Sequence, residues 1–480
     1  MNPALRFHAT AASRAEAVAL RLDGAAWRFG ELADLASRLA AALHGAGIRR
    51  GDLVVSRFAT PASELAAFFA LMHVGAVHCS IAHLGGAEIE VAPIAVLSDA
   101  QTLPALRDAL PDSRAIDIDA VPSSGRDAPD FAPAAPDDVS QLILTSGTTG
   151  RAKMVKLTHG AIAARTAIRS GYFPTPGGVL LLMGPMTAGG CQTALSTLLA
   201  GHTLDLSRDP DGLVRAVRAS GIDHVIASPV QLSGLLALLG RDGPAPGTLS
   251  GILLMGAAAS ASLIEAARRI FDCPITVMYG TSEVGACATV TLDATRPADA
   301  GQLTPLAGVR IEVVDDAGQP LPPGATGHVR IATPGMAAGY FADEPLSREH
   351  FRGEWFHPGD LGQLQGDGLV LAGRCDEMVN IGGVKFDPAE IDRMIEERRL
   401  AGDAAAFRFV DGSGVERLMV AAVTDSQHQF DRLRAEVAAY VAGRVPLGHF
   451  RIDRIPRNEM GKPLRQVLAE AVKRRLSVPG

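Results

Sequence analysis

The amino-acid sequence predicts an α/β protein that is built from more than one domain. Three observations support this prediction. Apolar stretches of strand type alternate with stretches of helix type, which favours a largely parallel sheet. The chain has 480 residues and a mass of 49.9 kDa, more than a single hydrophobic core usually accommodates. The pattern of apolar stretches also changes near residues 300 and 376.

The first part of the chain shows the alternation most clearly. Between Glu31 and His44, leucines recur at helical spacing and are followed by glycines, which predicts an amphipathic helix with a glycine stop. Residues 52–55 have the pattern of a strand, and residues 64–77 that of a buried helix. A polar, proline-rich stretch at 122–138 predicts a surface connection.

Beyond that connection, the apolar strand 141–144 follows at once. After about residue 300, short runs of β type at 309–314 and 328–331 are separated by Gly and Pro turns. Beyond Asp376 we expect a glycine turn, a helix from Pro388, a strand at 418–423, a helix near 430–441 and a basic end. This last segment predicts a small α+β domain.

Composition excludes several classes of protein. Hydrophobic residues make up 47% of the chain and charged residues 20%, which is typical of a globular protein rather than a disordered one. A net charge of -7 argues against a nucleic-acid binder. The five cysteines form no metal-ligand pattern, and neither a signal peptide nor a membrane span is evident. We therefore expect a cytoplasmic protein.

A run of glycines and hydroxyl side chains directly follows the strand 141–144 and ends in a lysine. Glycines let backbone N–H groups turn toward an anion, hydroxyls donate further hydrogen bonds, and the lysine supplies charge. The spacing does not match the P-loop, in which a lysine and then Ser or Thr directly follow the last glycine. The candidate phosphate-binding residues are Thr145, Ser146, Gly147, Thr148, Thr149, Gly150 and Lys153.

This loop resembles the signature of the adenylate-forming, AMP-binding superfamily, which contains acyl-CoA synthetases, peptide-synthetase adenylation domains and luciferases. Ala152 replaces the usual proline of that signature. The resemblance covers nearly the whole chain. It implies a large N-terminal region of stacked mixed sheets flanked by helices over residues 1–375, and a small mobile α+β domain over 376–480. It also implies ATP and Mg²⁺ as cofactors.

The run from Tyr279 to Glu283 is similar to the family motif Y-G-x-[TS]-E. The resemblance implies that the aromatic ring stacks on adenine, that Ser282 reaches the reacting groups, and that the Glu283 carboxylate holds Mg²⁺. Gly280 and Thr281 complete this nucleotide-binding loop. Upstream, Gly256, Ala257 and Ala258 resemble the segment of small residues whose backbone lies against adenine.

Two further motifs point to the ribose. Residues 355–361 match W-[YF]-x-T-G-D-L, which implies that Asp360 accepts hydrogen bonds from both ribose hydroxyls, although Pro358 replaces the threonine. Residues 373–376 resemble G-R-x-D, which implies that Arg374 also reaches the ribose. The same motif implies that Asp376 is the hinge between the two domains.

The C-terminal segment carries two more elements of the family. Gly382 and Gly383 resemble the loop that lines the channel for an incoming thiol, and a tight turn is the alternative explanation for these glycines. Residues 461–465 resemble G-K-x-x-R, which implies that Lys462 is the catalytic lysine, placed between the acid's carboxylate and the α-phosphate of ATP.

The identity of the acid depends on a missing residue. Amino-acid-activating members carry an aspartate where this chain has residues 184–191, a stretch without a carboxylate, so an apolar or weakly polar acid is favoured. The expected acyl pocket comprises Thr187, Gly190, Met255 and Met278. We expect coenzyme A as the acyl acceptor, with a carrier-protein phosphopantetheine as the alternative. An inactive nucleotide-binding regulator is the third hypothesis.

Overall fold

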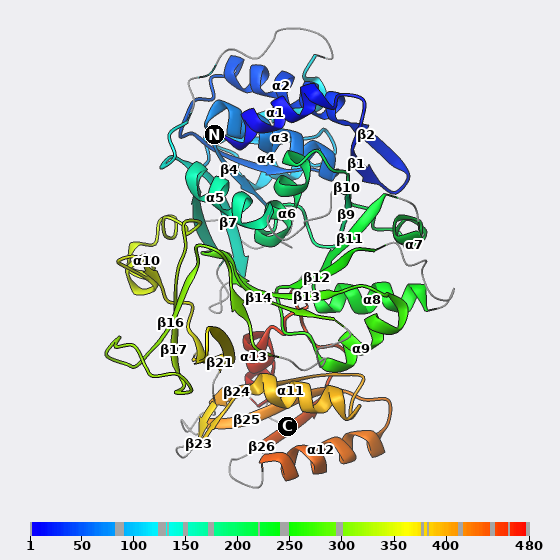
Figure 1. Cartoon of the computed structure of the whole chain (residues 1–480), viewed down its shortest axis with the longest axis vertical. Helices are drawn as coiled ribbons and strands as arrows, with labels where there is room; N and C mark the ends of the chain where they lie inside the picture. The colour runs from blue at the N-terminus through cyan, green and yellow to red at the C-terminus, as the bar shows by residue number, and fades with distance from the viewer. Residues whose placement is uncertain are drawn as a thin grey trace.

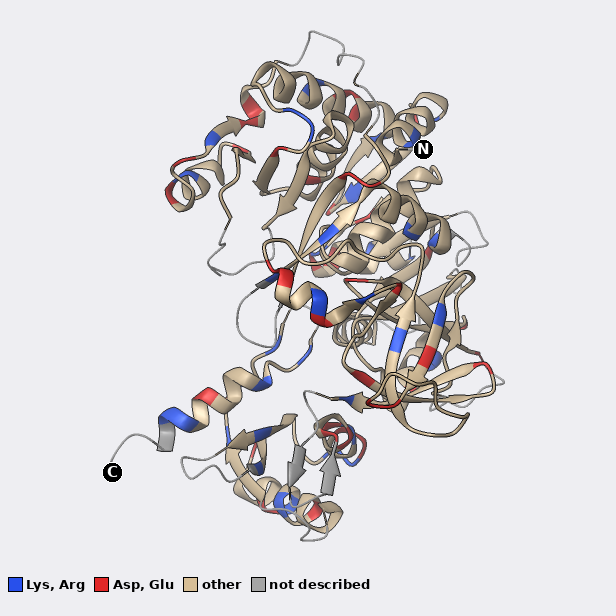
Figure 2. Cartoon of the chain, turned by 90° about the vertical axis from the view of Figure 1, so that its left-hand side faces the viewer, with Lys and Arg blue, Asp and Glu red and all other residues tan. Residues whose placement is uncertain are grey.

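The computed structural model confirms the α/β class (Figure 1). It describes residues 2–81, 91–122, 131, 134–146, 152–170, 177–218, 221–240, 249–293, 301–375, 379–381, 384–410, 416–441, 447–458 and 461–476. The chain forms three sheets in a large N-terminal region and a smaller body that contains the C-terminus (Figures 1 and 2). None of the helices in the described ranges is long and apolar enough to span a bilayer.

The largest sheet is mixed and has nine strands in the order β15-β14-β13-β12-β11-β9-β10-β1-β2. The six strands from β13 to β1 run parallel, and antiparallel partners close both edges. Its strands are β1 (Val18–Leu22), β2 (Ala25–Arg28), β9 (Gly178–Leu181), β10 (Leu204–Asp205), β11 (Ile222–Ala227), β12 (Gly251–Met255), β13 (Ile275–Thr281), β14 (Gly285–Leu292) and β15 (Thr304–Pro305).

A second sheet has six strands in the order β6-β5-β3-β4-β7-β8, of which only β8 is antiparallel to its neighbour. Its strands are β3 (Leu53–Arg57), β4 (Val77–Ser80), β5 (Ala95–Ser98), β6 (Arg114–Asp117), β7 (Val139–Ser146) and β8 (Ala152–Thr158). The third sheet is antiparallel, and it contains the two short runs of β type predicted after residue 300. It contains β16 (Arg310–Val314), β17 (Gly327–Ala332), β18 (Phe351–Arg352), β19 (Trp355–Phe356), β20 (Asp360–Gln365) and β21 (Gly368–Arg374).

Helices cover these sheets. They are α1 (Pro3–Ser13), α2 (Phe29–Gly45), α3 (Pro61–Val74), α4 (Leu103–Ala109), α5 (His159–Ser170), α6 (Ala188–Leu199), α7 (Pro210–Arg218), α8 (Pro229–Leu239), α9 (Ala261–Ile270) and α10 (Glu344–His350). Helix α3 is apolar on all sides and buried along almost its whole length. Thr60 caps its start and Gly75, in the left-handed conformation at φ 81°, ends it.

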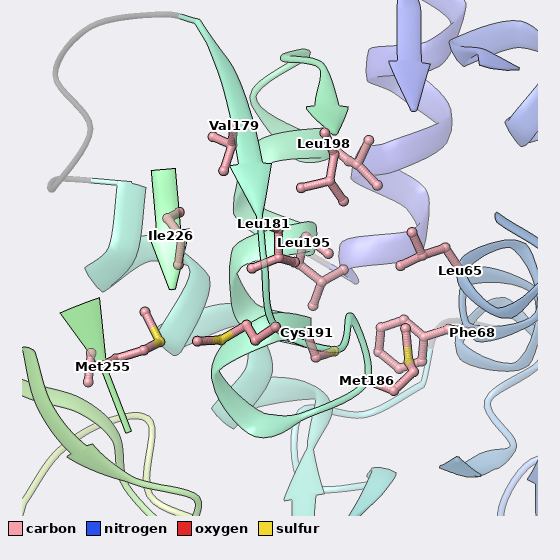
Figure 3. Close-up of a cluster of buried hydrophobic side chains, with 14 of the residues drawn as sticks. Leu65, Phe68, Val179, Leu181, Met186, Cys191, Leu195, Leu198, Ile226 and Met255 are labelled. Atoms are coloured by element: carbon pink, nitrogen blue, oxygen red, sulfur yellow. The ribbon is translucent and has the colours of Figure 1, made fainter. Parts of the chain in front are cut away.

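The core of the large region forms where α3 and α6 pack beside the nine-stranded sheet. Figure 3 shows side chains from α3, β9, α6, β11 and β12 in one cluster. Leu65 and Phe68 of α3 are fully buried there, and Cys191 and Leu195 of α6 face them. This packing holds the N-terminus of α6 beside the ends of β9 and β12.

The C-terminal segment has hydrophobic clusters of its own, made of residues from Ile391 onward. It contains the hairpin β22 (Val379–Ile381) and β23 (Val384–Phe386), and a three-stranded sheet of β24 (Asp403–Val410), β25 (Glu416–Val423) and β26 (Leu447–Arg451). Its helices are α11 (Pro388–Glu397), α12 (Gln427–Val441) and α13 (Arg465–Leu476). The boundary at 375/376 stays a prediction, because residues 376–378 are outside the described ranges.

Glu64 of α3 carries a buried carboxyl group in the core and is only 4% exposed. Its carboxyl accepts a hydrogen bond from the Ser80 hydroxyl. Burial raises the pKa of Glu64 to about 7, because the apolar surroundings disfavour the charged form. The folded protein therefore binds a proton at Glu64 that the unfolded chain releases at lower pH.

We predict that this group makes the stability of the protein fall as pH rises. Between pH 4.5 and about 7 the folded state holds more protons than the unfolded state, so the free energy of unfolding decreases through that window, by about 3 kcal/mol at most. Urea unfolding at pH 5 and pH 8 measures this difference. Glu64→Gln should remove that part of the pH dependence, whereas Glu265→Gln, at an exposed position on α9, should retain it.

Candidate active site

The candidate site lies at the carboxyl ends of parallel strands in the nine-stranded sheet. This is the edge at which open α/β sheets usually bind ligands. Gly256, Ala257 and Ala258 directly follow β12, and Tyr279 to Thr281 form the end of β13. Gly256 has φ 91°, a conformation that favours glycine, so the chain turns sharply as it leaves the sheet.

Asp360 lies at the centre of a buried polar cluster. Its side chain is 10% exposed, and both carboxylate oxygens accept hydrogen bonds: Oδ2 from the Tyr279 hydroxyl at 2.5 Å and Oδ1 from Arg374 Nη1 at 3.1 Å. Asp360 and Arg374 are direct partners in the β20–β21 ladder. Burial, followed by the neighbouring Asp360 charge, raises the pKa of Tyr279 well above its usual value. Tyr279 therefore stays protonated and acts as a donor.

Glu283 lies in the turn between β13 and β14. The Tyr340 hydroxyl donates a hydrogen bond to its Oε1 at 2.8 Å. On the other side, Lys153 Nζ is 5.6 Å from the centroid of the Tyr340 ring, in a cation–π contact. Lys153 itself is positioned by β8, where it pairs with Thr145 of β7. The structure thus brings the predicted phosphate lysine and the predicted metal carboxylate to the same tyrosine.

Tyr340 is a site residue that the sequence analysis did not identify. It is 2% exposed, and its pKa is raised by burial and by the Glu283 charge, so it remains a donor. It reaches the site because residues 338–341 pair with β8, including a bridge between Tyr340 and Val155. The signal that the sequence offered was the rarity of tyrosine: the chain has 4 tyrosines, and two of them, Tyr279 and Tyr340, lie in the candidate site.

The donor chemistry at Glu283 fits Mg²⁺. Among the described residues, no three His, Cys, Asp or Glu side chains lie close enough to form a metal cage by themselves. Magnesium is commonly held by one or two carboxylates together with the phosphates of a bound nucleotide. From the described part of the chain, the Glu283 carboxylate receives one hydrogen bond, from a neutral hydroxyl, which leaves lone pairs for a cation.

The predicted acyl-pocket residues lie together around the start of α6. Thr187 caps this helix, accepting a hydrogen bond from the Gly190 N–H at 3.2 Å and donating one to the Gly184 carbonyl at 2.8 Å. A Cβ atom on Gly190 would lie 1.9 Å from that carbonyl, so only glycine fits. Met255 and Met278 are paired neighbours on β12 and β13, and both are buried.

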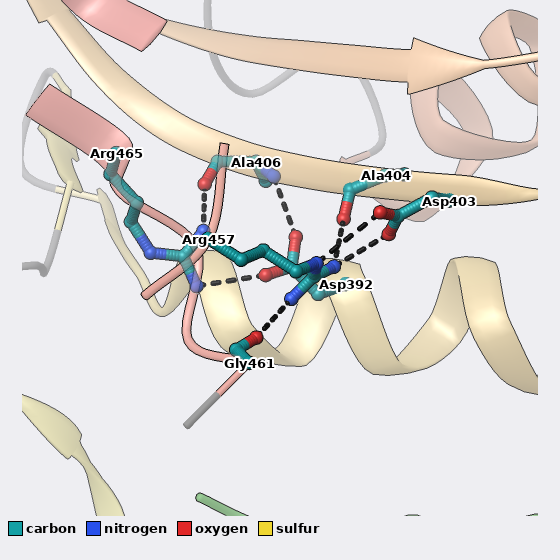
Figure 4. Close-up of polar contacts among 7 residues, drawn as sticks. All are labelled: Asp392, Asp403, Ala404, Ala406, Arg457, Gly461 and Arg465. Carbon is teal, nitrogen blue, oxygen red and sulfur yellow. Dashed lines mark hydrogen bonds and ion pairs between the residues drawn. The ribbon is translucent and has the colours of Figure 1, made fainter. Parts of the chain in front are cut away.

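Lys462 lies on a turn of the C-terminal segment, where its carbonyl accepts a hydrogen bond from the Asn458 N–H. Two arginines next to this turn hold it in place (Figure 4). Arg457 forms an ion pair with Asp403 at 2.5 Å and donates to the Gly461 carbonyl at 2.6 Å. Arg465 forms an ion pair with the largely buried Asp392 at 2.8 Å. These contacts explain the arginine of the G-K-x-x-R pattern: it fixes the base of the turn, while the lysine stays exposed.

This turn packs against the large region at the site edge. Gly461, at φ 79°, lies so close to Val230 that a Cβ atom on it would be 2.4 Å from Val230 Cγ1. Val230 lies in the first turn of helix α8, which starts shortly after the carboxyl end of β11. Nearby, the Ser260 hydroxyl donates to Glu396 of α11 at 2.8 Å. The lysine turn therefore faces the same edge of the nine-stranded sheet as Gly256 and Tyr279.

Several predicted residues cannot be placed. Gly147, Thr148, Thr149 and Gly150, together with Asp376, Gly382 and Gly383, lie outside the described residues. The backbone of Ser146 ends β7, and Ser282, which is half-buried, precedes Glu283 in the turn.

Comparisons with known proteins agree with this architecture. A family model described as AMP-binding enzyme matches residues 7–341. A fatty acid–acyl-carrier-protein ligase of Streptomyces coeruleorubidus is 30% identical over 352 residues, covering 70% of this chain and 68% of the relative. An indoleacetate–CoA ligase of Aromatoleum aromaticum is 27% identical over 482 residues, covering 93% of each chain.

A solved structure has the same fold. The o-succinylbenzoate coenzyme A synthetase of Bacillus subtilis, in complex with ATP and magnesium ion, superposes with a TM-score of 0.84. The match covers 96% of this chain and 98% of that chain at 22% identity. This likeness confirms stacked sheets with a large N-terminal and a small C-terminal domain.

We predict that Tyr340→Phe weakens ATP use while leaving the fold intact. The variant keeps the buried ring and its contact with Lys153 but removes the hydrogen bond to Glu283, so the carboxylate loses its support. KM for ATP in acid-dependent pyrophosphate release should rise roughly tenfold, in line with the loss of a hydrogen bond to a charged group. Tyr440→Phe, on the partly exposed face of α12, is the control. An unchanged KM in Tyr340→Phe would show that this hydrogen bond does not support ATP use.

Proposed function

Because the chain belongs to the AMP-binding enzyme family, we propose that it activates a carboxylic acid with ATP and transfers the acyl group to coenzyme A. One observation carries this proposal: Asp360 with Tyr279 and Arg374, Glu283 with Tyr340, and the turn that bears Lys462 all face one edge of the nine-stranded sheet. The first step forms an acyl adenylate and releases pyrophosphate.

The chain's residues act in this step by positioning and by neutralising charge. The substrate carboxylate attacks the α-phosphorus of ATP, the bond to the β-phosphate oxygen breaks, and no general base is needed because the nucleophile is already ionised. Asp360 and Arg374 hold the ribose, and Lys153 binds the β- and γ-phosphates. Glu283 would hold Mg²⁺, which would supply positive charge to neutralise the phosphate oxygens. Lys462 stabilises the charge that develops between the acid and the α-phosphate.

In the second step, the thiol of coenzyme A attacks the acyl carbonyl and AMP leaves. We propose that the small domain rotates about Asp376, which withdraws Lys462 and brings Gly382 and Gly383 to the thiol channel. The contacts of Gly461 with Val230 and of Ser260 with Glu396 belong to the arrangement that suits the first step. They must separate for the second.

The acid is proposed to be apolar or weakly polar. The pocket residues Met255 and Met278 are buried thioethers, and the start of α6 carries no carboxylate to pair with an ammonium group. This environment disfavours a free α-amino acid, whose charge would be buried without a partner.

Carrier-protein loading is the second candidate for the acceptor. The observation that favours it is the fatty acid–acyl-carrier-protein ligase, at 30% identity over 70% of this chain. Coenzyme A and a carrier protein present the same phosphopantetheine thiol, so the chemistry of the transfer is identical. The two acceptors differ in whether a protein surface must dock beside the site.

The acceptor is tested by pyrophosphate release from ATP and a panel of carboxylic acids. With Mg²⁺ but no thiol, we expect release to stop after about one turnover, because the adenylate stays bound. Added coenzyme A should restore turnover. Turnover that requires a holo carrier protein, and not the apo carrier, would favour loading instead. If no acid in the panel supported release, the proposed activity would be wrong.

We predict that Lys462→Ala separates the two half-reactions. Removing this charge should slow adenylate formation roughly 100-fold or more. Thioester formation from a supplied acyl adenylate should stay close to that of the unchanged protein, because Lys462 is withdrawn in that step. Lys473→Ala removes an exposed lysine of the same domain, paired with Glu470, and serves as the control. Equal loss of both half-reactions in Lys462→Ala would contradict the assignment.

A further inference from the structure

A buried arginine lies directly behind Glu283 and belongs to none of the motifs. Arg165 is on α5, the helix that follows the phosphate loop and β8, and it is 3% exposed. Its Nη2 donates a hydrogen bond to the main-chain carbonyl of Glu283 at 2.7 Å, and its Nε donates to the carbonyl of Gly335 at 2.6 Å. One side chain thus joins three segments that are far apart in the sequence.

Two glycines form a slot for this side chain. A Cβ atom on Gly335 would lie 2.6 Å from Arg165 Cγ. A Cβ atom on Gly285, where φ is 75°, would lie 3.2 Å from Arg165 Nε. Larger residues at either position would displace the guanidinium, so the local sequence on both sides accommodates the arginine.

The carbonyl that Arg165 binds is tied to the rest of the site. It also accepts a hydrogen bond from the Ala337 N–H at 2.7 Å. Three residues later, Tyr340 donates to the carboxylate of the same Glu283. Segment 335–340 therefore binds both the main chain and the side chain of Glu283. Arg165 binds both partners of this contact, through the carbonyls of Gly335 and Glu283.

A buried charge has a cost that a packing role alone does not explain. Burial lowers the pKa of Arg165 to about 10, and its Nη1 has no hydrogen-bond partner among the described residues. An apolar side chain would fill the slot without that cost. What the arginine adds is a pair of fixed donors and a positive charge close to Glu283.

Arg208 shows what a purely structural arginine looks like in this protein. It also donates only to backbone carbonyls, those of Leu181, Met183, Leu206 and Ser207. Its contacts join β9 to the segment after β10 and do not include Glu283. Both arginines donate to backbone carbonyls, but Arg208 is exposed and lacks the contact with the candidate metal ligand that the buried Arg165 makes.

We propose that Arg165 is a positioning residue that sets the Glu283 carboxylate for Mg²⁺ by fixing the main-chain carbonyl of Glu283. This inference rests on the proposed role of Glu283 as metal ligand. The guanidinium binds the main chain of the turn and Tyr340 binds the carboxylate, whose remaining lone pairs would be available to the cation. Arg165 does not contact substrate or metal itself.

The test measures metal binding directly. Mn²⁺ replaces Mg²⁺ in the full chain with a non-hydrolysable ATP analogue, and free Mn²⁺ is followed by electron paramagnetic resonance. Arg165→Met should weaken Mn²⁺ binding roughly tenfold to a hundredfold, as loss of a supporting partner usually does. Arg165→Lys should recover part of that loss, since it keeps the charge and one donor. Arg208→Lys should lower the melting temperature and leave Mn²⁺ affinity unchanged.

The outcomes separate this inference from the proposed function. Glu283→Gln should weaken Mn²⁺ binding at least as much as Arg165→Met, and unchanged binding in Glu283→Gln would overturn the metal role of Glu283 itself. If Glu283→Gln loses affinity while Arg165→Met binds Mn²⁺ like the unchanged protein, the positioning role is overturned. If Arg165→Met does not fold, Arg165→Lys and Gly335→Ala, which displaces the guanidinium, decide the question by the same measurement.

Discussion

The hydrogen bond from the Tyr340 hydroxyl to the Glu283 carboxylate holds the two halves of the candidate site together. Glu283 belongs to the nine-stranded sheet, and Tyr340 is carried by a segment that pairs with β8 of the six-stranded sheet. Together with the hydrogen bonds from Ala337 and Arg165 to the Glu283 carbonyl, this bond joins the carboxylate to the segment that pairs with β8. The contact between Lys153 and the Tyr340 ring extends the same link.

Close backbone approach is the second constraint on the site. Gly190 fits only because no side chain separates the start of α6 from the Gly184 carbonyl, and Gly285 and Gly335 leave the slot for Arg165. Each of these glycines lets a helix or a side chain come within direct contact of main-chain atoms. The residues that border the proposed ligands are thus set by packing behind them as much as by their own chemistry.

The turn that carries Lys462 is rigid within the small domain but, in the proposed rotation, moves relative to the large region. Arg457 and Arg465 fix the turn to the small domain through Asp403 and Asp392, so Lys462 moves only when that domain moves. The contacts to the large region described above are one apolar contact, Gly461 against Val230, and one hydrogen bond, from Ser260 to Glu396. The turn is thus held firmly by the small domain and weakly by the large region. This suits Lys462, which must be positioned accurately in the first step and withdrawn in the second.

Much of this protein can be predicted from the sequence, because its signals are local. Helical spacing predicted the helix at 31–44, which the structure extends to Phe29–Gly45, and the apolar run at 141–144 lies within β7. The motifs around Tyr279, Asp360 and Arg374 are short and contiguous, so residue type and order were enough to identify the family, which the comparisons confirm.

The tertiary structure alone decided which residues meet. Tyr340 and Arg165 carry no motif, and they join Glu283 across 57 and 118 residues of chain through pairing and helix packing that no local pattern encodes. The order of the nine strands could not be predicted from the sequence either, because it depends on how the strands and helices pack together rather than on the pattern of any one strand. Residue chemistry follows from the sequence; the distances between chemical groups come from long-range packing, which only the folded chain defines.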